Sequence, residues 1–292
     1  MYKQMLRALG GLLLLASLPV YTSEPSVLAS IKPLALIARE ITGDVDTLLP
    51  AGGSPHEFSL RVSDMRQINS VPLVIWIGAG LEGFLQKPLA GKSPQQVLTL
   101  SQLPGLHWPS ALAHHHHGHS HGQQHEQDWH LWLNPLNAVV IANAIAERLG
   151  EIQGSLAPVY RRRAEDFAAR MQLLDTDLQT QLAPLNKEGF AVYHDAYNHF
   201  VARYGLKQMD YISLTPEQQP GARHVHHLSQ SLTGARCLFT EPGADSAMVD
   251  NLARRGGLVL AELDPLATRP GTQSYSQLLQ ALALDLSACL GQ

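Results

Sequence analysis

The segment LAPVYRRRAEDFAARMQLLDTDLQTQL, residues 156–182, decides the architecture that this sequence predicts. Its apolar side chains recur at intervals of three and four residues, so they share one stripe of a helix. The stripe consists of Leu156, Tyr160, Ala164, Phe167, Met171, Leu174, Leu178 and Leu182. A helix of about 27 residues is roughly 40 Å long. We predict that it connects two lobes, with coiled-coil pairing as the weaker alternative.

On both sides of this helix, short apolar runs alternate with helical patterns, which is typical of an α/β fold. We therefore predict two α/β lobes joined by one long helix. The expected strands are 27–31, 45–49, 73–77, 190–193, 237–240 and 258–263, and the expected helices are 33–42, 195–204 and 246–255. Asp195 is the expected N-cap of the second of these helices.

Composition places the chain among ordinary globular proteins, with 45% hydrophobic and 16% charged residues. The formal net charge of −4 excludes a basic field for nucleic acid or an acidic membrane surface. Histidine stands out, because seven of the 15 histidines fall within residues 114–125. Histidine is the commonest metal-binding side chain, so composition alone points to transition metals.

The first 23 residues have the layout of a secretory signal peptide. Lys3 and Arg7 give a positive start, residues 9–18 are apolar, and polar residues follow. About ten apolar residues are too few to span a bilayer. No cysteine stands directly after the apolar run, which argues against a lipoprotein. We expect an exported protein whose signal peptide is cleaved.

The rest of the chain divides around the long helix. We expect an N-terminal lobe at 24–155, the connecting helix at 156–183 and a C-terminal lobe at 184–292. Residues 107–130 are rich in His, Gly, Ser and Gln and lack periodicity, so we expect a mobile loop there.

Cys237 and Cys289 are the only cysteines of the chain. Two thiols in an exported protein usually form a disulfide. The alternatives are two buried free thiols or, less favoured for want of CxxC spacing, a zinc site.

Four residues sit where an α/β sheet presents ligands, just beyond apolar or strand-like segments. They are His56, His130, His194 and Asp264. Taken singly, a strand-end histidine is more often a hydrogen-bonded structural residue, and an aspartate before proline is a common turn starter. Taken together, in both lobes and beside a histidine tract, they indicate a metal held in a cleft between the lobes.

Five motifs carry a resemblance to a known family: GSPHEFSLR at 53–61, HLWLNP at 130–135, YHDAY at 193–197, EP at 241–242 and LDPL at 263–266. The chain resembles the metal-specific solute-binding proteins of ABC transporters, and within them the periplasmic high-affinity zinc-uptake proteins. The resemblance covers nearly the whole mature chain. It implies two lobes, each a sheet flanked by helices, a single long spanning helix and metal in the cleft.

The resemblance also implies a ligand set. His56, His130 and His194 match the family's histidine ligands, and a histidine at the third position favours zinc over manganese. Some zinc members use a carboxylate immediately before the first histidine, where this chain has Pro55. The fourth ligand is therefore Asp264 or a water. The second motif ends in Asn134 where many members have Asp, which leaves the details around that ligand open.

The chemistry of the ligands agrees with zinc. Three neutral imidazoles and one oxygen suit a tetrahedral Zn²⁺ site, whereas manganese prefers octahedral oxygen ligands. The histidine tract forms several weak sites, and we interpret it as a local metal collector, with a dispensable solvated loop as the alternative. Its ligands are His114, His115, His116, His117, His119, His121 and His125. We interpret His224, His226 and His227 as a helix or turn surface rather than a second metal site.

The function that we expect is a non-enzymatic one. A monomeric periplasmic receptor captures Zn²⁺ and delivers it to a membrane permease that a cytoplasmic ATPase drives, without any nucleic-acid partner. A manganese-binding or adhesin member of the same fold is an alternative. A secreted zinc hydrolase is a more distant one, because no HExxH motif is present and the nearest base candidate is Glu57.

Overall fold

The computed structural model describes residues 24, 26–43, 45–109, 127–218, 220–244 and 247–292. The expected signal peptide at 1–23 and all seven ligands of the histidine tract lie outside the described residues. The ends of the segment expected as a loop, 107–109 and 127–130, are described, and His130 is buried there.

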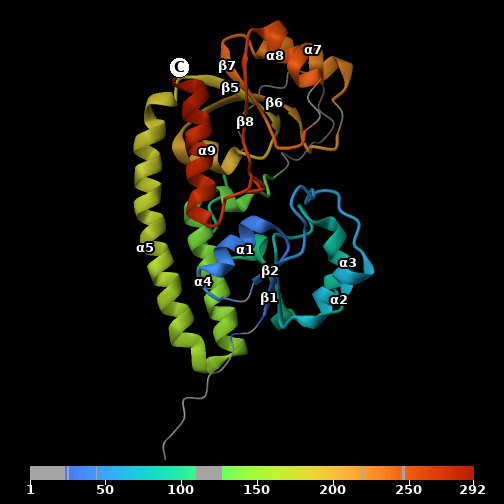
Figure 1. Cartoon of the computed structure of the whole chain (residues 1–292), viewed down its shortest axis with the longest axis vertical. Coiled ribbons are helices and arrows are strands. Elements are labelled where there is room, and N and C mark those ends of the chain that lie inside the picture. Colours follow the sequence, from blue (N-terminus) through green and yellow to red (C-terminus); the bar gives the residue numbers. More distant parts are fainter. Residues whose placement is uncertain (1–23, 25, 44, 110–126, 219, 245–246) are drawn as a thin grey trace, which may run out of the picture.

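The described chain holds two four-stranded parallel sheets (Figure 1). The first has the order β2-β1-β3-β4 and the second the order β6-β5-β7-β8. The strands are β1 (Val27–Ala29), β2 (Val45–Thr47), β3 (Leu73–Trp76), β4 (Val97–Thr99), β5 (Gly189–His194), β6 (Lys207–Ser213), β7 (Ala235–Thr240) and β8 (Val259–Glu262). Three of the four central strands, β1, β3 and β5, are buried along their whole length, as parallel strands covered on both faces require.

Helices cover both sheets, and we call each sheet with its helices a lobe. The helices are α1 (Lys32–Arg39), α2 (Val62–Ser70), α3 (Gln86–Leu89), α4 (Pro135–Ile152), α5 (Ala157–Leu182), α6 (Asn198–Tyr204), α7 (Ala222–Ser231), α8 (Ala247–Gly256) and α9 (Tyr275–Leu290). The predicted fold of two α/β lobes is confirmed. In the described part of the chain, no helix is both long and apolar enough to cross a membrane.

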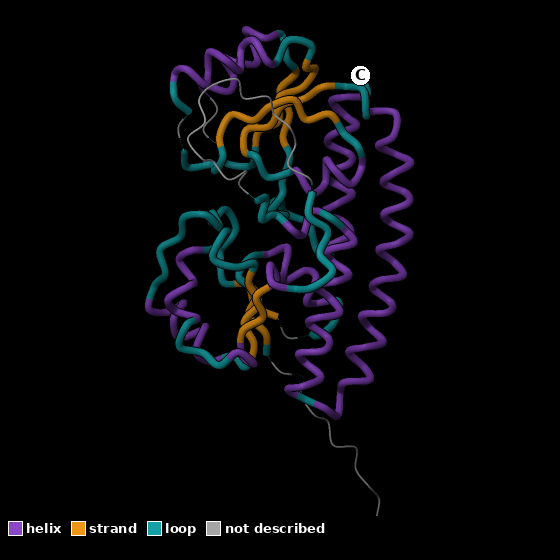
Figure 2. Tube along the Cα trace, turned by 180° about the vertical axis from the view of Figure 1, so that it is seen from behind, coloured by secondary structure: helices purple, strands orange, loops and turns teal. Residues whose placement is uncertain are grey.

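Helix α5 is the predicted long helix, and it runs beside both lobes (Figures 1 and 2). Seven of the eight stripe residues are buried within it, and Leu156 lies one residue before its start. The stripe packs on α4 and α9. The helix therefore connects the lobes through one continuous core rather than standing as a separate coiled coil.

The expected helix at 195–204 is shorter than predicted. α6 begins at Asn198 after the N-cap Tyr197, so the interpretation of Asp195 as its N-cap was wrong. The Asp195 carboxylate instead accepts hydrogen bonds from the side chains of Asn198 and Gln208. The end of the helix follows the prediction, because Gly205 adopts the left-handed conformation (φ 64°) that glycine tolerates.

The predicted disulfide is present. Cys237 in β7 and Cys289 in α9 are bonded, and they lie 52 residues apart in the sequence. Both alternatives, buried free thiols and a two-cysteine zinc site, were therefore wrong. The bond attaches the last helix of the chain to the sheet of the C-terminal lobe.

Candidate metal centre

Three histidines meet between the lobes. One ring nitrogen from each of His56, His130 and His194 lies within 4.8 Å of the others, and among the described residues this is the one group of its kind. The centroids of the His194 ring and the other two rings are 4.9 Å apart, and those of His56 and His130 are 5.5 Å apart. The sequence predicted these residues as neighbours, and the fold brings them together.

Sheet topology explains why residues so distant in sequence meet. His194 is the last residue of β5, the strand between β6 and β7 in its sheet. His56 lies in the loop from β2 to α2, and His130 precedes the short turn Leu131–Leu133 that leads into α4. Loops beyond the carboxyl ends of parallel strands form the usual binding crevice of α/β folds.

His130 is held by a carboxylate two residues away. Oδ1 of Asp128 lies 2.6 Å from Nδ1 of His130 and also accepts its backbone N–H. Both side chains are buried. Nδ1 therefore carries the proton in a neutral ring, and Nε2 is left with its lone pair free for a metal.

His194 has an equivalent partner in Glu241, the residue directly after β7. Oε1 of Glu241 lies 3.1 Å from Nδ1 of His194 and accepts a hydrogen bond from the Tyr197 hydroxyl. The two carboxylates Asp128 and Glu241 were missed as orienting groups. The only available signal was that Glu241 follows an apolar strand and Asp128 stands two residues before a candidate ligand.

The electrostatics of the group keep two of the rings neutral. Burial, followed by repulsion from the other two histidines, lowers the pKa of His56 to about 2. Burial is also the main cause that lowers the pKa of His130 well below its ordinary value. For His194, burial acts downward, but the carboxylates of Glu241, Asp128 and Asp195 together outweigh it and raise the pKa.

Two ring nitrogens of this group have no hydrogen-bond partner. Nε2 of His56 and Nε2 of His194 are buried and make no hydrogen bond. A buried polar atom left without a partner costs free energy, about 1–3 kcal/mol. With the Nε2 of His130, these two nitrogens surround one point and fit a cation that takes nitrogen ligands, as zinc does.

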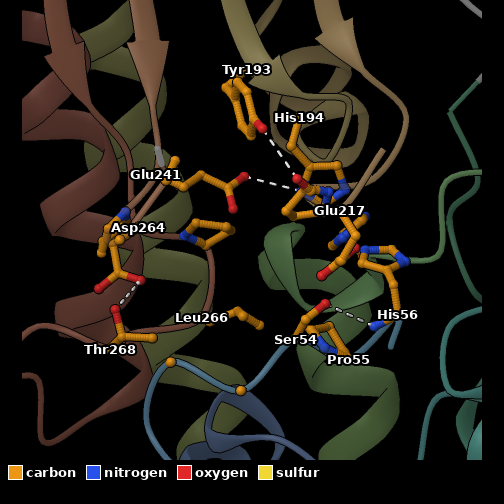
Figure 3. A pocket seen from close by; sticks show the side chains of 18 of the residues that line it. Ser54, Pro55, His56, Tyr193, His194, Glu217, Glu241, Asp264, Leu266 and Thr268 are labelled. Atoms are coloured by element: carbon orange, nitrogen blue, oxygen red, sulfur yellow. Dashed lines mark hydrogen bonds and ion pairs between the residues drawn. The ribbon is translucent and has the colours of Figure 1, made fainter. Parts of the chain in front are cut away.

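Asp264 stands apart from the three histidines. It is buried and lines the same cavity, but it is not a member of the close group. Its Oδ1 accepts from the Thr268 hydroxyl and its Oδ2 from the backbone N–H of Arg269 (Figure 3). Both carboxylate oxygens thus already have a hydrogen-bond partner. The choice between Asp264 and water as a fourth ligand stays a prediction.

The histidines open onto a cavity of about 600 Å³ that residues of both lobes line. In Figure 3 the Ser54–His56 segment approaches from one side, and Glu241 and Asp264 stand opposite. Glu57, the candidate general base, is exposed and does not line the cavity. The acidic side chains of the lining are Glu217, Glu241 and Asp264, which favour a cationic occupant.

The second histidine cluster lies on α7, as expected for a surface helix. Nε2 of His224 is 3.0 Å from the backbone carbonyl oxygen of Tyr211 and donates to it. His226 and His227 are exposed. In the described chain, these histidines form no group of three ligand atoms.

Comparisons with known proteins show the family of this chain. Residues 27–289 match a family described as zinc-uptake complex component A, periplasmic. The high-affinity zinc uptake system protein ZnuA of Haemophilus ducreyi is 35% identical over 307 residues, covering 96% of this chain and 98% of that protein. ZnuA of Yersinia pestis is 32% identical, covering 97% and 96%.

A solved structure has the same fold. A crystal structure of ZnuA superposes with a TM-score of 0.78 at 22% sequence identity, covering 92% of this chain and all of that one.

Proposed function

The chain belongs to the family of periplasmic zinc-uptake complex component A proteins, and we propose from this premise that it receives Zn²⁺ in the cleft between its lobes. The protein is a solute-binding protein that captures zinc with high affinity for an ABC-type importer. This family is one of receptors rather than enzymes.

One observation carries the assignment of the site. Three buried or half-buried histidines from three separate segments place their ring nitrogens within 4.8 Å of one another. Two of them have a carboxylate on the opposite ring nitrogen, the arrangement that fixes the tautomer of metal-binding histidines. We assign His56, His130 and His194 as the ligands of Zn²⁺.

The fourth position of a tetrahedral site then belongs to water or to Asp264. Asp264 is not among the ligand atoms of the close group, so its carboxylate reaches the ion only if it moves toward the three histidines. Water needs no such movement, so we favour water as the fourth ligand. Three imidazoles and one oxygen suit zinc better than manganese, which prefers oxygen-rich octahedral sites.

Location and partners follow from the family and from the sequence of residues 1–23. We propose that a signal peptide directs the protein to the periplasm and is then cleaved, and that the mature protein acts as a monomer. It delivers Zn²⁺ to a membrane permease driven by a cytoplasmic ATPase. The histidine tract at 114–125 serves as a local collector of zinc at weak sites.

Metal analysis tests this function. Protein purified without chelator should carry zinc, and a titration of metal-free protein in the presence of a competing chelator should give much tighter binding of Zn²⁺ than of Mn²⁺. Tighter binding of Mn²⁺ would establish the manganese alternative instead. The controls are variants in which His194 or His130 is replaced by alanine, and these should lose the tightest binding event.

A further inference from the structure

The ligand His130 precedes α5 in the sequence, on the side of the N-terminal lobe. Its neighbour Asp128 is nevertheless hydrogen-bonded to the C-terminal lobe. Oδ2 of Asp128 accepts the backbone N–H of Asn198, the first residue of α6, at 3.0 Å. The backbone carbonyl of Asp128 accepts from Nε2 of His199 at 2.9 Å. One buried carboxylate thus joins the imidazole of His130, through Oδ1, to the start of α6, through Oδ2.

Trp132, two residues after the ligand, makes the same connection. Its indole Nε1 donates to the carbonyl oxygen of Pro265 at 2.7 Å, and its own carbonyl accepts from the Tyr275 hydroxyl at 2.6 Å. Trp132 and Tyr275 are completely buried. On the side of the N-terminal lobe, the Trp129 ring packs so closely over Gly80 that a Cβ there would lie 2.1 Å from it.

His194 lies beside this connection and has a carboxylate of its own. It ends β5, four residues before Asn198, and its ring centroid is 4.9 Å from that of His130. Each of these two rings has a carboxylate on Nδ1, Asp128 for one and Glu241 for the other. The pair is therefore oriented before any metal arrives.

His56 lacks such support. Its backbone N–H donates to the Ser54 hydroxyl within the same loop. Across the described residues, no carboxylate pairs with its imidazole, and its electrostatic neighbours are His130 and His194. The orientation of His56 thus depends on its own loop.

We propose that Asp128 is a positioning residue that bonds His130 to the C-terminal lobe, so that His130 and His194 form a preassembled pair and His56 joins the ion last. This inference rests on the proposed zinc-binding function. A cation first meets two oriented nitrogens, and the loop of His56 then closes on it. His56 accordingly controls how long zinc stays, whereas the pair controls how fast it enters.

Stopped-flow kinetics with Zn²⁺ and a chromogenic chelator tests the order of ligands in the full-length protein. The variants are His56→Ala and His130→Ala, with a His130→Ala, His194→Ala double variant to subtract zinc held outside the cleft. His56→Ala should keep the association rate within about threefold of wild type and release zinc much faster, since contacts made late act on dissociation. His130→Ala should slow association as well. Equal effects of the two single variants on both rates would overturn the order.

A double-mutant cycle tests the role of Asp128. Asp128→Asn keeps the shape of the side chain but cannot accept from both His130 and Asn198. It should weaken zinc binding about tenfold to a hundredfold, in the wild-type and in the His56→Ala background alike. In the His130→Ala background it should have no effect, and exposed Asp166→Asn should have none anywhere.

An equal loss in the His130→Ala background would show that Asp128 does not act through His130 and would overturn the proposal. A wild-type protein that binds no zinc would instead overturn the proposed function, and this inference with it.

Discussion

Nδ1 of His194 lies 3.1 Å from Oε1 of Glu241, at the ends of two strands that pair in the sheet of the C-terminal lobe. This contact turns Nε2 of His194 toward the other two histidines and leaves it buried without a partner. The carboxylate also raises the pKa of the ring against the effect of burial. The sheet thus supplies a ligand together with the group that orients it.

Replacing Glu241 by glutamine should weaken zinc binding about tenfold to a hundredfold, because removal of a group that orients a metal-binding histidine has effects of this size. Titration calorimetry with a competing chelator measures the change. Glu217→Gln is the matched control, since Glu217 lines the same cavity but is exposed. Equal losses in both variants would mean that the charge of the cavity matters, and not the contact with His194.

Zinc binding should release about one proton per ion near pH 6, because an imidazole must be neutral to bind. In the metal-free protein the pKa of His194 is raised, whereas the pKa values of His56 and His130 are lowered. Near that pH only His194 carries a proton to displace. The affinity for zinc should therefore fall as the pH is lowered, with the slope expected for the binding of one proton.

Calorimetry in buffers of different ionisation enthalpy, with less than one equivalent of zinc, counts the protons. Release of nearly three protons would contradict the conclusion that His56 and His130 are neutral in the metal-free protein.

Glu82 should make the protein less stable as the pH rises. Its side chain is fully buried, Oε2 accepts from the backbone of Ile77 and Gly78, and burial raises its pKa to about 7. Between an unfolded pKa of 4.5 and this value, the unfolded chain loses a proton that the folded chain keeps. The folded state binds more protons, so the free energy of unfolding falls, by about 3 kcal/mol across the window.

Urea unfolding of the wild type and of Glu82→Gln between pH 4.5 and 7 measures how steeply the free energy of unfolding falls with pH, which is the slope in question. The variant should lose most of it, and exposed Glu57→Gln should keep it. An unchanged slope in Glu82→Gln would assign the effect to other groups.

Part of this account could be predicted from the sequence. The stripe of α5 has the period of a helix buried on one face, and the three histidines follow or adjoin apolar segments. The strand β4 has three residues, two of them half-buried, and shows no such signal. Neither does β6, because polar Gln208 and Asp210 occupy two of its buried positions. α4 was missed because apolar residues occupy most of its faces.

The orienting carboxylates could not be predicted for a different reason. The contact between Glu241 and His194 joins residues 47 positions apart. Asp128 is only two residues from His130, but its other oxygen is held by Asn198, 70 positions away. Sequence spacing places residues on one face of a helix or strand, but it does not say which loops meet. Asp195 was misjudged as a cap for the same reason, because its partner Gln208 belongs to the next strand.

Deletion of residues 114–125 should leave the tightest zinc site intact and remove only weaker equivalents. His56, His130 and His194 all lie outside this stretch, and their contacts described above involve none of its residues. The weak sites should empty as the pH falls through about 6.5, the ordinary pKa of histidine. Calorimetric titration of both proteins at neutral and mildly acidic pH measures this. Loss of the tightest event in the deletion variant would mean that the tract supplies a primary ligand.

The central claim is that His56, His130 and His194 together hold one zinc ion. Anomalous diffraction at the zinc edge, from crystals of the zinc-loaded protein, tests it most directly. We predict one strong peak between the lobes, bonded to a ring nitrogen of each histidine at about 2.0–2.1 Å. A strongest peak located elsewhere, or one without all three histidines, would contradict the account.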